Sequence, residues 1–292
     1  MPIVPNSFSS GDEPFAPNAA PRNNMPRLTS GRSSCQTVEL HPPEASIEER
    51  EMTDDGVAKH DLNDASIYDN AEYLANNPSW HVEDSPWKAA RIFEILDRNS
   101  IKPARIVEVG CGAGEILVQL KTKLPGSTFV GYEMSSQAFK LASERERPGV
   151  QFVNKSIFHD NVHFDALLCI DVFEHVDDYI GFVRSLKKFA KYKVFHIPLD
   201  LSVQSVFRSQ ALLDARKSVG HLHYFTKQTA IETVRYAGYE IIDHHLTAMA
   251  MELPNRGLRA NLMNVPRWLL SRLSPDLAAR LLGGWSLMVL AR

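Results

Sequence analysis

Cysteine is scarce in this sequence, and its placement excludes two familiar ways of stabilising a small fold. The 292 residues contain three cysteines, Cys35, Cys111 and Cys169, an odd number without paired spacing. Such a set forms neither a disulfide framework nor a cysteine zinc motif. We therefore expect a reducing compartment, the cytoplasm by default, and no bound metal.

Long apolar runs and a surplus of positive charge are missing as well. No stretch reaches 18 uninterrupted apolar residues, and the N-terminus lacks the basic start and apolar run of a signal peptide. We expect no membrane-spanning segment. The formal net charge of −3 offers no surface for a polyanion, so nucleic acid is not expected as a partner.

The N-terminal part of the chain has few large apolar side chains. Residues 1 to about 45 are rich in Pro, Asn, Ser and Gly, and an acidic stretch follows up to residue 64. A segment of this kind buries too little surface to offset its ordering entropy. We predict a disordered tail over residues 1–64 and a folded domain over residues 65–292.

From Arg105 onward, short apolar runs alternate with stretches of helical spacing. Strands are predicted at 106–109, 128–132, 150–153, 164–170, 193–197, 239–244 and 285–290, and helices at 87–96, 115–123, 136–144, 179–190 and 226–237. This alternation favours an α/β fold with right-handed crossovers and a mostly parallel sheet. The long connection before the last strand predicts a helical insertion at about 247–284, with helices from Pro266 to Leu273 and from Pro275 to Leu282.

A glycine-rich turn ends the first predicted strand and opens the next helix. It reads Val107-Glu108-Val109-Gly110-Cys111-Gly112-Ala113-Gly114. Glycines allow a tight turn and close approach of a ligand to the free N–H groups of the helix. Dinucleotide sites share this feature, but their third glycine would stand at position 115, where the chain has Glu115. The turn predicts a nucleotide-type ligand.

An acid ends the second predicted strand. Glu133 lies 19 residues after Gly114, about the spacing at which an acid binds ribose hydroxyls in dinucleotide folds. This feature does not separate S-adenosylmethionine from NAD. A further apolar strand, 164–170, leads to Asp171, Glu174 and His175, which we expect at the ligand-binding edge of the sheet.

Together these segments resemble the class I S-adenosylmethionine-dependent methyltransferases. The resemblance covers about residues 80–292 and is greatest toward the small-molecule branch that includes the ubiquinone-pathway O-methyltransferases. Its motifs are Glu108-Val109-Gly110-Cys111-Gly112-Ala113-Gly114, Glu133, Asp171-Val172-Phe173-Glu174-His175-Val176, Gly220-His221-Leu222-His223-Tyr224-Phe225-Thr226 and the closing Trp285–Arg292 segment. The resemblance implies a Rossmann-like sheet of seven strands, mostly parallel with an antiparallel last strand, and helices on both faces.

The resemblance also assigns cofactor contacts. Glu108 and the turn residues Gly110, Cys111, Gly112 and Gly114 would hold the methionine end of S-adenosyl-L-methionine. Glu133 would bind the ribose, with Met134, Ser156 and Ile157 near the adenine, and Asp171 and Val172 facing the methionine portion. Many members carry an Asp after the third strand, where this chain has Lys155-Ser156-Ile157.

Methyl transfer from a sulfonium depends mainly on alignment of the reacting atoms. A hydroxyl acceptor also needs a base, and histidine suits neutral pH. His175 is the first candidate, followed by His221 and His223. Trp80, His81, Trp87 and Lys88 precede the first strand and either cover the pocket or pack a helix.

The prediction is an enzyme that methylates a small-molecule acceptor, with oxygen favoured as the methylated atom. Two alternatives stay open: an NAD-dependent oxidoreductase, and a non-catalytic module that binds S-adenosylmethionine. The oligomeric state is open. For the basic and partly apolar insertion, a substrate lid is favoured over a dimer contact or a membrane-surface helix.

Overall fold

The computed structural model describes residues 77, 79–253 and 258–292. The predicted tail over residues 1–64 lies outside these residues. No helix among those described has the length and apolar character that crossing a lipid bilayer requires.

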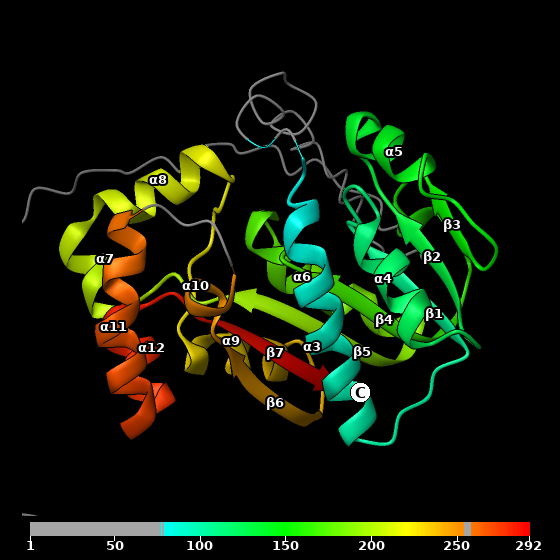
Figure 1. Cartoon of the computed structure of the whole chain (residues 1–292). Coiled ribbons are helices and arrows are strands. Elements are labelled where there is room, and N and C mark those ends of the chain that lie inside the picture. The colour runs from blue at the N-terminus through cyan, green and yellow to red at the C-terminus, as the bar shows by residue number, and fades with distance from the viewer. Residues whose placement is uncertain (1–76, 78, 254–257) are drawn as a thin grey trace, which may run out of the picture. The chain divides into compact units, whose positions relative to one another are not determined.

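One sheet of seven strands runs through the described part of the chain (Figure 1). The strands are β1 (Arg105–Val109), β2 (Thr128–Tyr132), β3 (Val150–Val153), β4 (Phe164–Ile170), β5 (Ala190–Pro198), β6 (Ile241–Thr247) and β7 (Ser286–Ala291). Their order is β3-β2-β1-β4-β5-β7-β6, and β7 runs in the direction opposite to the other six described strands. The predicted seven-stranded, mostly parallel sheet with an antiparallel last strand is confirmed.

Helices cover both faces of the sheet, because successive side chains of each strand point to opposite faces. In β4, Leu167 and Cys169 belong to the core on one face, whereas Ala166 and Leu168 belong to the core on the other. The first core packs α6 (Tyr179–Ser185) and α9 (Lys227–Tyr236); the second packs α3 (Ser85–Arg98), α4 (Glu115–Lys123) and α5 (Ser136–Ser143). Figure 1 shows α3 and α4 lying across the near face.

Local signals in the sequence account for several helix starts. The Thr226 hydroxyl accepts a hydrogen bond from the Thr229 N–H while the Thr229 hydroxyl accepts one from the Thr226 N–H, a capping box at the start of α9. Ser135 caps α5 in a simpler way, by accepting from the Ala138 N–H. Such caps satisfy the first N–H groups of a helix, which have no partner within it.

Three regions differ from the sequence prediction. Helices α7 (Val203–Arg208) and α8 (Gln210–Ser218) were not predicted. The predicted helix 179–190 is α6 followed by a 3-10 helix, Leu186–Phe189, and β5 already begins at Ala190. Between β6 and β7 lie α10 (Met249–Glu252), α11 (Leu258–Leu273) and α12 (Pro275–Leu282), with α11 beginning eight residues before its predicted start at Pro266.

Candidate cofactor and acceptor site

A cavity of about 880 Å³ opens at the carboxyl ends of β1, β2 and β4. The strand order reverses between β1 and β4, and open α/β sheets bind ligands at such a reversal. All eleven cofactor residues predicted from the sequence line this cavity: Glu108, Gly110, Cys111, Gly112, Gly114, Glu133, Met134, Ser156, Ile157, Asp171 and Val172. The fold thus brings residues from four strand ends into one space.

The glycine turn after β1 is held by hydrogen bonds to β2. The N–H groups of Gly110 and Cys111 both donate to the Tyr132 carbonyl, at 2.8 and 3.1 Å. Gly114 stands at the N-cap of α4 with φ +78°, and a Cβ there would lie 2.4 Å from the Phe152 ring. Both the left-handed backbone and the absence of space require glycine at position 114.

Gly112, unlike Gly114, has open space beside its Cα atom. Its φ is +53°, yet a Cβ added to it would meet only the Trp80 ring, at 3.9 Å. The space beside Gly112 is therefore part of the cavity, with Trp80 on its far side. A ligand in this space could approach the backbone at the start of α4 closely.

Glu133 binds the glycine turn directly. Its Oε2 accepts a hydrogen bond from the Gly112 N–H and its Oε1 accepts one from the Ser135 N–H, each at 2.8 Å. The side chain is 9% exposed. Carboxylate oxygens can accept further hydrogen bonds beyond these two, so Glu133 can hold the turn and still accept from hydroxyl groups of a ligand.

Glu108 is a second buried acid in the wall of the cavity. The residue is 1% exposed, and its Oε2 has no hydrogen-bond partner. Burial raises the pKa of this carboxyl well above its ordinary value; Lys88 opposes the rise, while Glu133 and Asp171 add to it. A buried acid without a donor is costly, and a cationic or N–H group of a ligand would satisfy it.

A family model described as a methyltransferase domain matches residues 82–244, which include the glycine turn, Glu133, Asp171 and all three candidate histidines. The chain belongs to this family. The match confirms the predicted methyltransferase and leaves the ubiquinone-pathway branch as a prediction.

Solved structures, among them two of methyltransferases, have the same fold. A SAM-dependent methyltransferase from Thiobacillus denitrificans, solved with S-adenosyl-L-homocysteine, is 16% identical, with 75% of this chain and 98% of that chain covered and a TM-score of 0.53. The E. coli protein YjhP is 19% identical over 76% of this chain and 100% of its own, with a TM-score of 0.54. The plantazolicin methyltransferase BpumL is 14% identical over 79% and 93%, with a TM-score of 0.51. No curated protein matches the sequence.

Within this methyltransferase domain, Asp171 is the most constrained acid of the cavity. It follows β4 with φ +53°, a conformation that costs energy for residues other than glycine. Its two carboxylate oxygens lie 2.6 Å from His196 Nδ1 and 2.8 Å from Lys88 Nζ. Although burial opposes ionisation, His196 and Lys88 hold the pKa of Asp171 far below its usual range.

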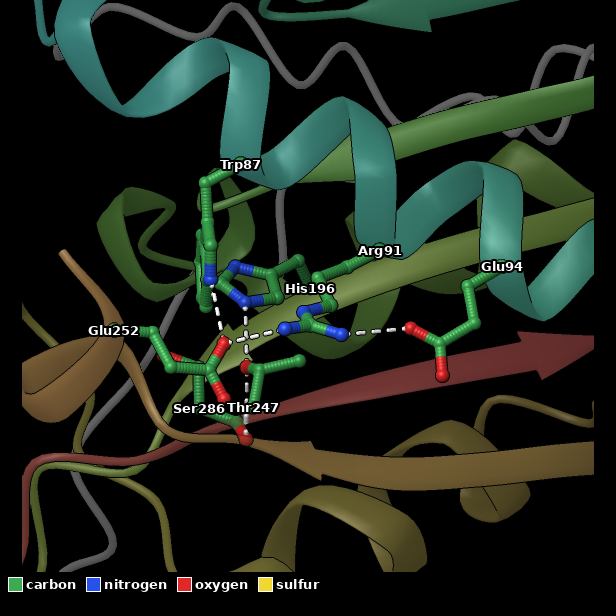
Figure 2. A network of polar contacts seen from close by, with 7 residues as sticks. All are labelled: Trp87, Arg91, Glu94, His196, Thr247, Glu252 and Ser286. Atoms are coloured by element: carbon green, nitrogen blue, oxygen red, sulfur yellow. Dashed lines mark hydrogen bonds and ion pairs between the residues drawn. The ribbon is translucent and has the colours of Figure 1, made fainter. Parts of the chain in front are cut away.

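A polar network behind Asp171 joins the strands to α3 and α10 (Figure 2). His196 Nε2 lies 3.0 Å from the Thr247 hydroxyl, which in turn donates to the Ser286 carbonyl. The Trp87 ring meets the edge of the His196 ring, and its indole N–H donates to Glu252. His196, which lies in β5 and contacts Asp171, is therefore oriented by residues of β6, β7, α3 and α10.

The three candidate histidines lie near one another but have different surroundings. His175 and His221 both line the cavity, with ring centroids 4.9 Å apart. His175 Nδ1 lies 3.1 Å from the Gly220 carbonyl, and His221 Nδ1 lies 2.6 Å from Asp200 Oδ2. His223 is not among the lining residues; its Nε2 lies 2.9 Å from the Val176 carbonyl and its ring packs on Tyr179.

Residues after β3 form another part of the wall. Ser156 caps the 3-10 helix Ile157–His159 by accepting from the Phe158 N–H, and Ile157 is buried in the core. Lys155 forms an ion pair with Asp160, with its Nζ 2.7 Å from Oδ1. Met134 is 39% exposed at the end of β2 and lines the cavity beside Ser156.

Sequence reasoning missed several residues of this region. His196, Asp200 and, from α8, Ala215 and Ser218 were not singled out, although the last three line the cavity. His196 and Asp200 lie at the carboxyl end of a predicted strand, so their position was a usable signal. The α8 residues carry no local signal, because only the tertiary fold places that helix beside the cavity.

Proposed function

We propose that this chain transfers a methyl group from S-adenosyl-L-methionine to an oxygen of a small-molecule acceptor. The observation that carries the proposal is the single cavity in which the glycine turn and Glu133 share a space with His175 and His221. One wall provides the groups that hold a nucleoside. Another provides the imidazole of His175, which can accept a proton.

Two features of the cavity fit the methyl donor. Glu133 supplies carboxylate oxygens for ribose hydroxyls, while the open space beside Gly112 admits a ligand close to the start of α4. The buried Oε2 of Glu108, which has no hydrogen-bond partner, would accept from the amino group of the methionine portion. Bound there, the sulfonium supplies an activated methyl group.

The remaining role of the protein is to position the acceptor and take up a proton. Burial, followed by the neighbouring His221, lowers the pKa of His175 to about 4. The imidazole is therefore neutral at pH 7 and can accept the proton that a hydroxyl acceptor loses. The contact of His175 Nδ1 with the Gly220 carbonyl places the proton on Nδ1 and directs Nε2 away from that carbonyl.

The acceptor would occupy the side of the cavity that α8 and Met249 border. Ala215, Ser218 and Val219 come from the end of α8 and the turn after it, and Met249 begins α10. Cavities of about 300–1,000 Å³ are the usual size for small-molecule sites. The proposed acceptor is accordingly a small molecule that shares the cavity with the donor.

A dinucleotide such as NAD is the competing ligand, and the carboxylate of Glu115 disfavours its binding. Glu115, which replaces the third glycine of the dinucleotide fingerprint, is held at the first turn of α4 by Arg145, 3.1 Å away. A carboxylate there repels a pyrophosphate. NAD is therefore the competitor to include in a binding test.

Calorimetric titration of the full chain with S-adenosylmethionine, S-adenosylhomocysteine and NAD tests the proposal. We expect saturable one-to-one binding of the first two and none of NAD. A panel of phenols, carboxylic acids and amines, followed by release of S-adenosylhomocysteine, then identifies the methylated atom. Preference for NAD would overturn the cofactor assignment, and turnover with amines alone would overturn oxygen as the acceptor.

A further inference from the structure

Glu174, His175 and His221 form a cluster on the histidine side of the cavity. One potential ligand atom from each residue lies within 4.8 Å of those of the other two. Glu174 and His175 belong to the 3-10 helix Phe173–His175, whereas His221 comes from the segment between α8 and α9. Because 45 residues lie between the two histidines, they form no local sequence motif, which is why the sequence predicted no metal.

Backbone hydrogen bonds hold the two segments together. The Glu174 carbonyl accepts from the N–H groups of both Leu222 and His223, at 2.9 and 3.0 Å. His221 is therefore positioned beside the 3-10 helix by the main chain on its C-terminal side. The juxtaposition is a consequence of the fold and does not depend on a flexible side chain.

Glu174 has an unusual environment for a carboxylate. The side chain is 0% exposed, and neither Oε1 nor Oε2 has a hydrogen-bond partner. His175 Nε2 lies 3.8 Å from Glu174 Oε1, beyond hydrogen-bonding distance. Removing an ionised carboxylate from water without a counter-charge or donors is expensive, so a cation at this point would satisfy both oxygens.

Both imidazoles are oriented as metal-binding histidines usually are. His221 Nδ1 lies 2.6 Å from Asp200 Oδ2, and His175 Nδ1 lies 3.1 Å from the Gly220 carbonyl. A carboxylate or carbonyl on one ring nitrogen fixes the tautomer that presents the other nitrogen, Nε2, as a ligand. The cluster therefore contains two imidazoles with outer partners and one buried carboxylate.

We propose that Glu174, His175 and His221 bind one divalent transition-metal cation, with Zn²⁺ as the best match, and leave an open coordination position toward the cavity. Two histidines and one carboxylate form a known ligand set of zinc sites that keep a position for substrate or water. Nitrogen donors disfavour Mg²⁺ and Ca²⁺, which prefer oxygen. Zinc bonds of about 2.0–2.2 Å need ligand atoms about 3.4 Å apart, so side-chain shifts of about 1 Å would complete the site.

The open position would take an oxygen of the acceptor. This role rests on the proposed methyl transfer, whereas metal binding itself does not. A metal-bound hydroxyl loses its proton more readily, and the acceptor would be oriented by its bond to the cation. With the cation bound, His175 is a ligand and not the base, so the proton of the acceptor passes to water; in the metal-free protein His175 accepts it. The substrate class this favours is a phenol, an enol or a hydroxy acid.

Titration of the metal-stripped full chain with Zn²⁺, and with Co²⁺ followed by visible absorption, tests the site. We expect one equivalent to bind in the wild type, with loss of binding in Glu174→Gln and His221→Ala. Asp200→Asn should weaken binding by about 10- to 100-fold, because it alters an outer partner only. His163→Ala, which removes an exposed histidine outside the cluster, should bind like the wild type.

Circular dichroism and S-adenosylhomocysteine titration of the same variants separate this proposal from the previous one. Folded variants that bind S-adenosylhomocysteine but not Zn²⁺ would support the metal site. Absence of one-to-one Zn²⁺ binding in the wild type, equal binding of Mg²⁺, or unchanged affinity in Glu174→Gln would overturn it. Failure of S-adenosylhomocysteine to bind the wild type would instead overturn the proposed function and leave the metal result intact.

Discussion

Lys88 Nζ lies 2.8 Å from Asp171 Oδ2, which joins the first turn of α3 to the end of β4. Both side chains line the cavity and are largely buried. The ion pair raises the pKa of Lys88 despite the opposing effect of burial, and His196 completes the environment of Asp171 on the other side. An ion pair, together with the packing of its apolar face, therefore holds helix α3 against the site.

Lys88→Met should destabilise the fold by about 3 kcal/mol, because it removes one of the two groups that pair with the buried Asp171 carboxylate and leaves His196 alone to do so. Urea unfolding followed by circular dichroism measures the change. Lys227→Met is the matched control: its partner Asp276 is half exposed, so the loss should be about 0–1 kcal/mol. Equal losses in the two variants would contradict the structural role of the Lys88 pair.

Gly112→Arg should abolish binding of S-adenosylhomocysteine while the protein stays folded. The added side chain enters the open space between Gly112 and Trp80, which we assign to the ligand. Residue 112 has a φ of +53°, where a residue other than glycine adds strain of about 1 kcal/mol. This is small beside the total free energy of unfolding. Gly126→Arg adds the same charge at a glycine with open space around it and should keep wild-type affinity in the same calorimetric titration.

His175→Ala should lower turnover by about 10²- to 10⁴-fold, the usual contribution of a general base, and leave the affinity for S-adenosylhomocysteine nearly unchanged. The reason is that His175 lies with His221 on the acceptor wall, whereas the glycine turn and Glu133 hold the donor. Steady-state rates with a hydroxyl acceptor, together with calorimetry, separate the two effects. A wild-type rate would remove His175 as the base.

The strands were predictable because their signals are local. The run of β4, which is apolar after Asp165, and the glycine turn after β1 gave the right boundaries of β4 and α4, since buried parallel strands and tight turns each require particular residue types. The bounds of β6 were harder to predict. The strand runs from Ile241 to Thr247 instead of from Tyr239 to His244, and Tyr239 lies before it, with its hydroxyl donating to the Val183 carbonyl.

The acceptor side of the site could be predicted only in part. His175 and His221 were found from motifs, but the approach of His221 to Glu174 depends on main-chain hydrogen bonds from Leu222 and His223, which lie 48 and 49 positions after Glu174. The lining from α8 likewise depends on how that helix packs, which the sequence of the helix itself does not specify. Spatial neighbours that are distant in sequence leave no pattern in a single chain.

The surroundings of His245 lead us to expect that the free energy of unfolding decreases in acid. Burial, followed by the nearby Arg98 guanidinium, lowers the pKa of His245 to about 4, and Arg98 Nη2 lies 3.0 Å from its Nδ1. The unfolded chain protonates this histidine below about pH 6.5, whereas the folded chain does not until about pH 4. The stability is therefore complete above pH 6.5 and falls as the pH is lowered toward 4.

His245→Gln should remove this part of the pH dependence. The unfolding free energy of the wild type minus that of the variant should be constant from pH 7 to 8 and fall by about 1 kcal/mol between pH 6.5 and 4, a value reduced for solvent screening because the histidine is partly exposed. Urea unfolding at several pH values measures the difference. A difference that is flat over the whole range, or that rises in acid, would mean that His245 is protonated in the folded protein beside Arg98.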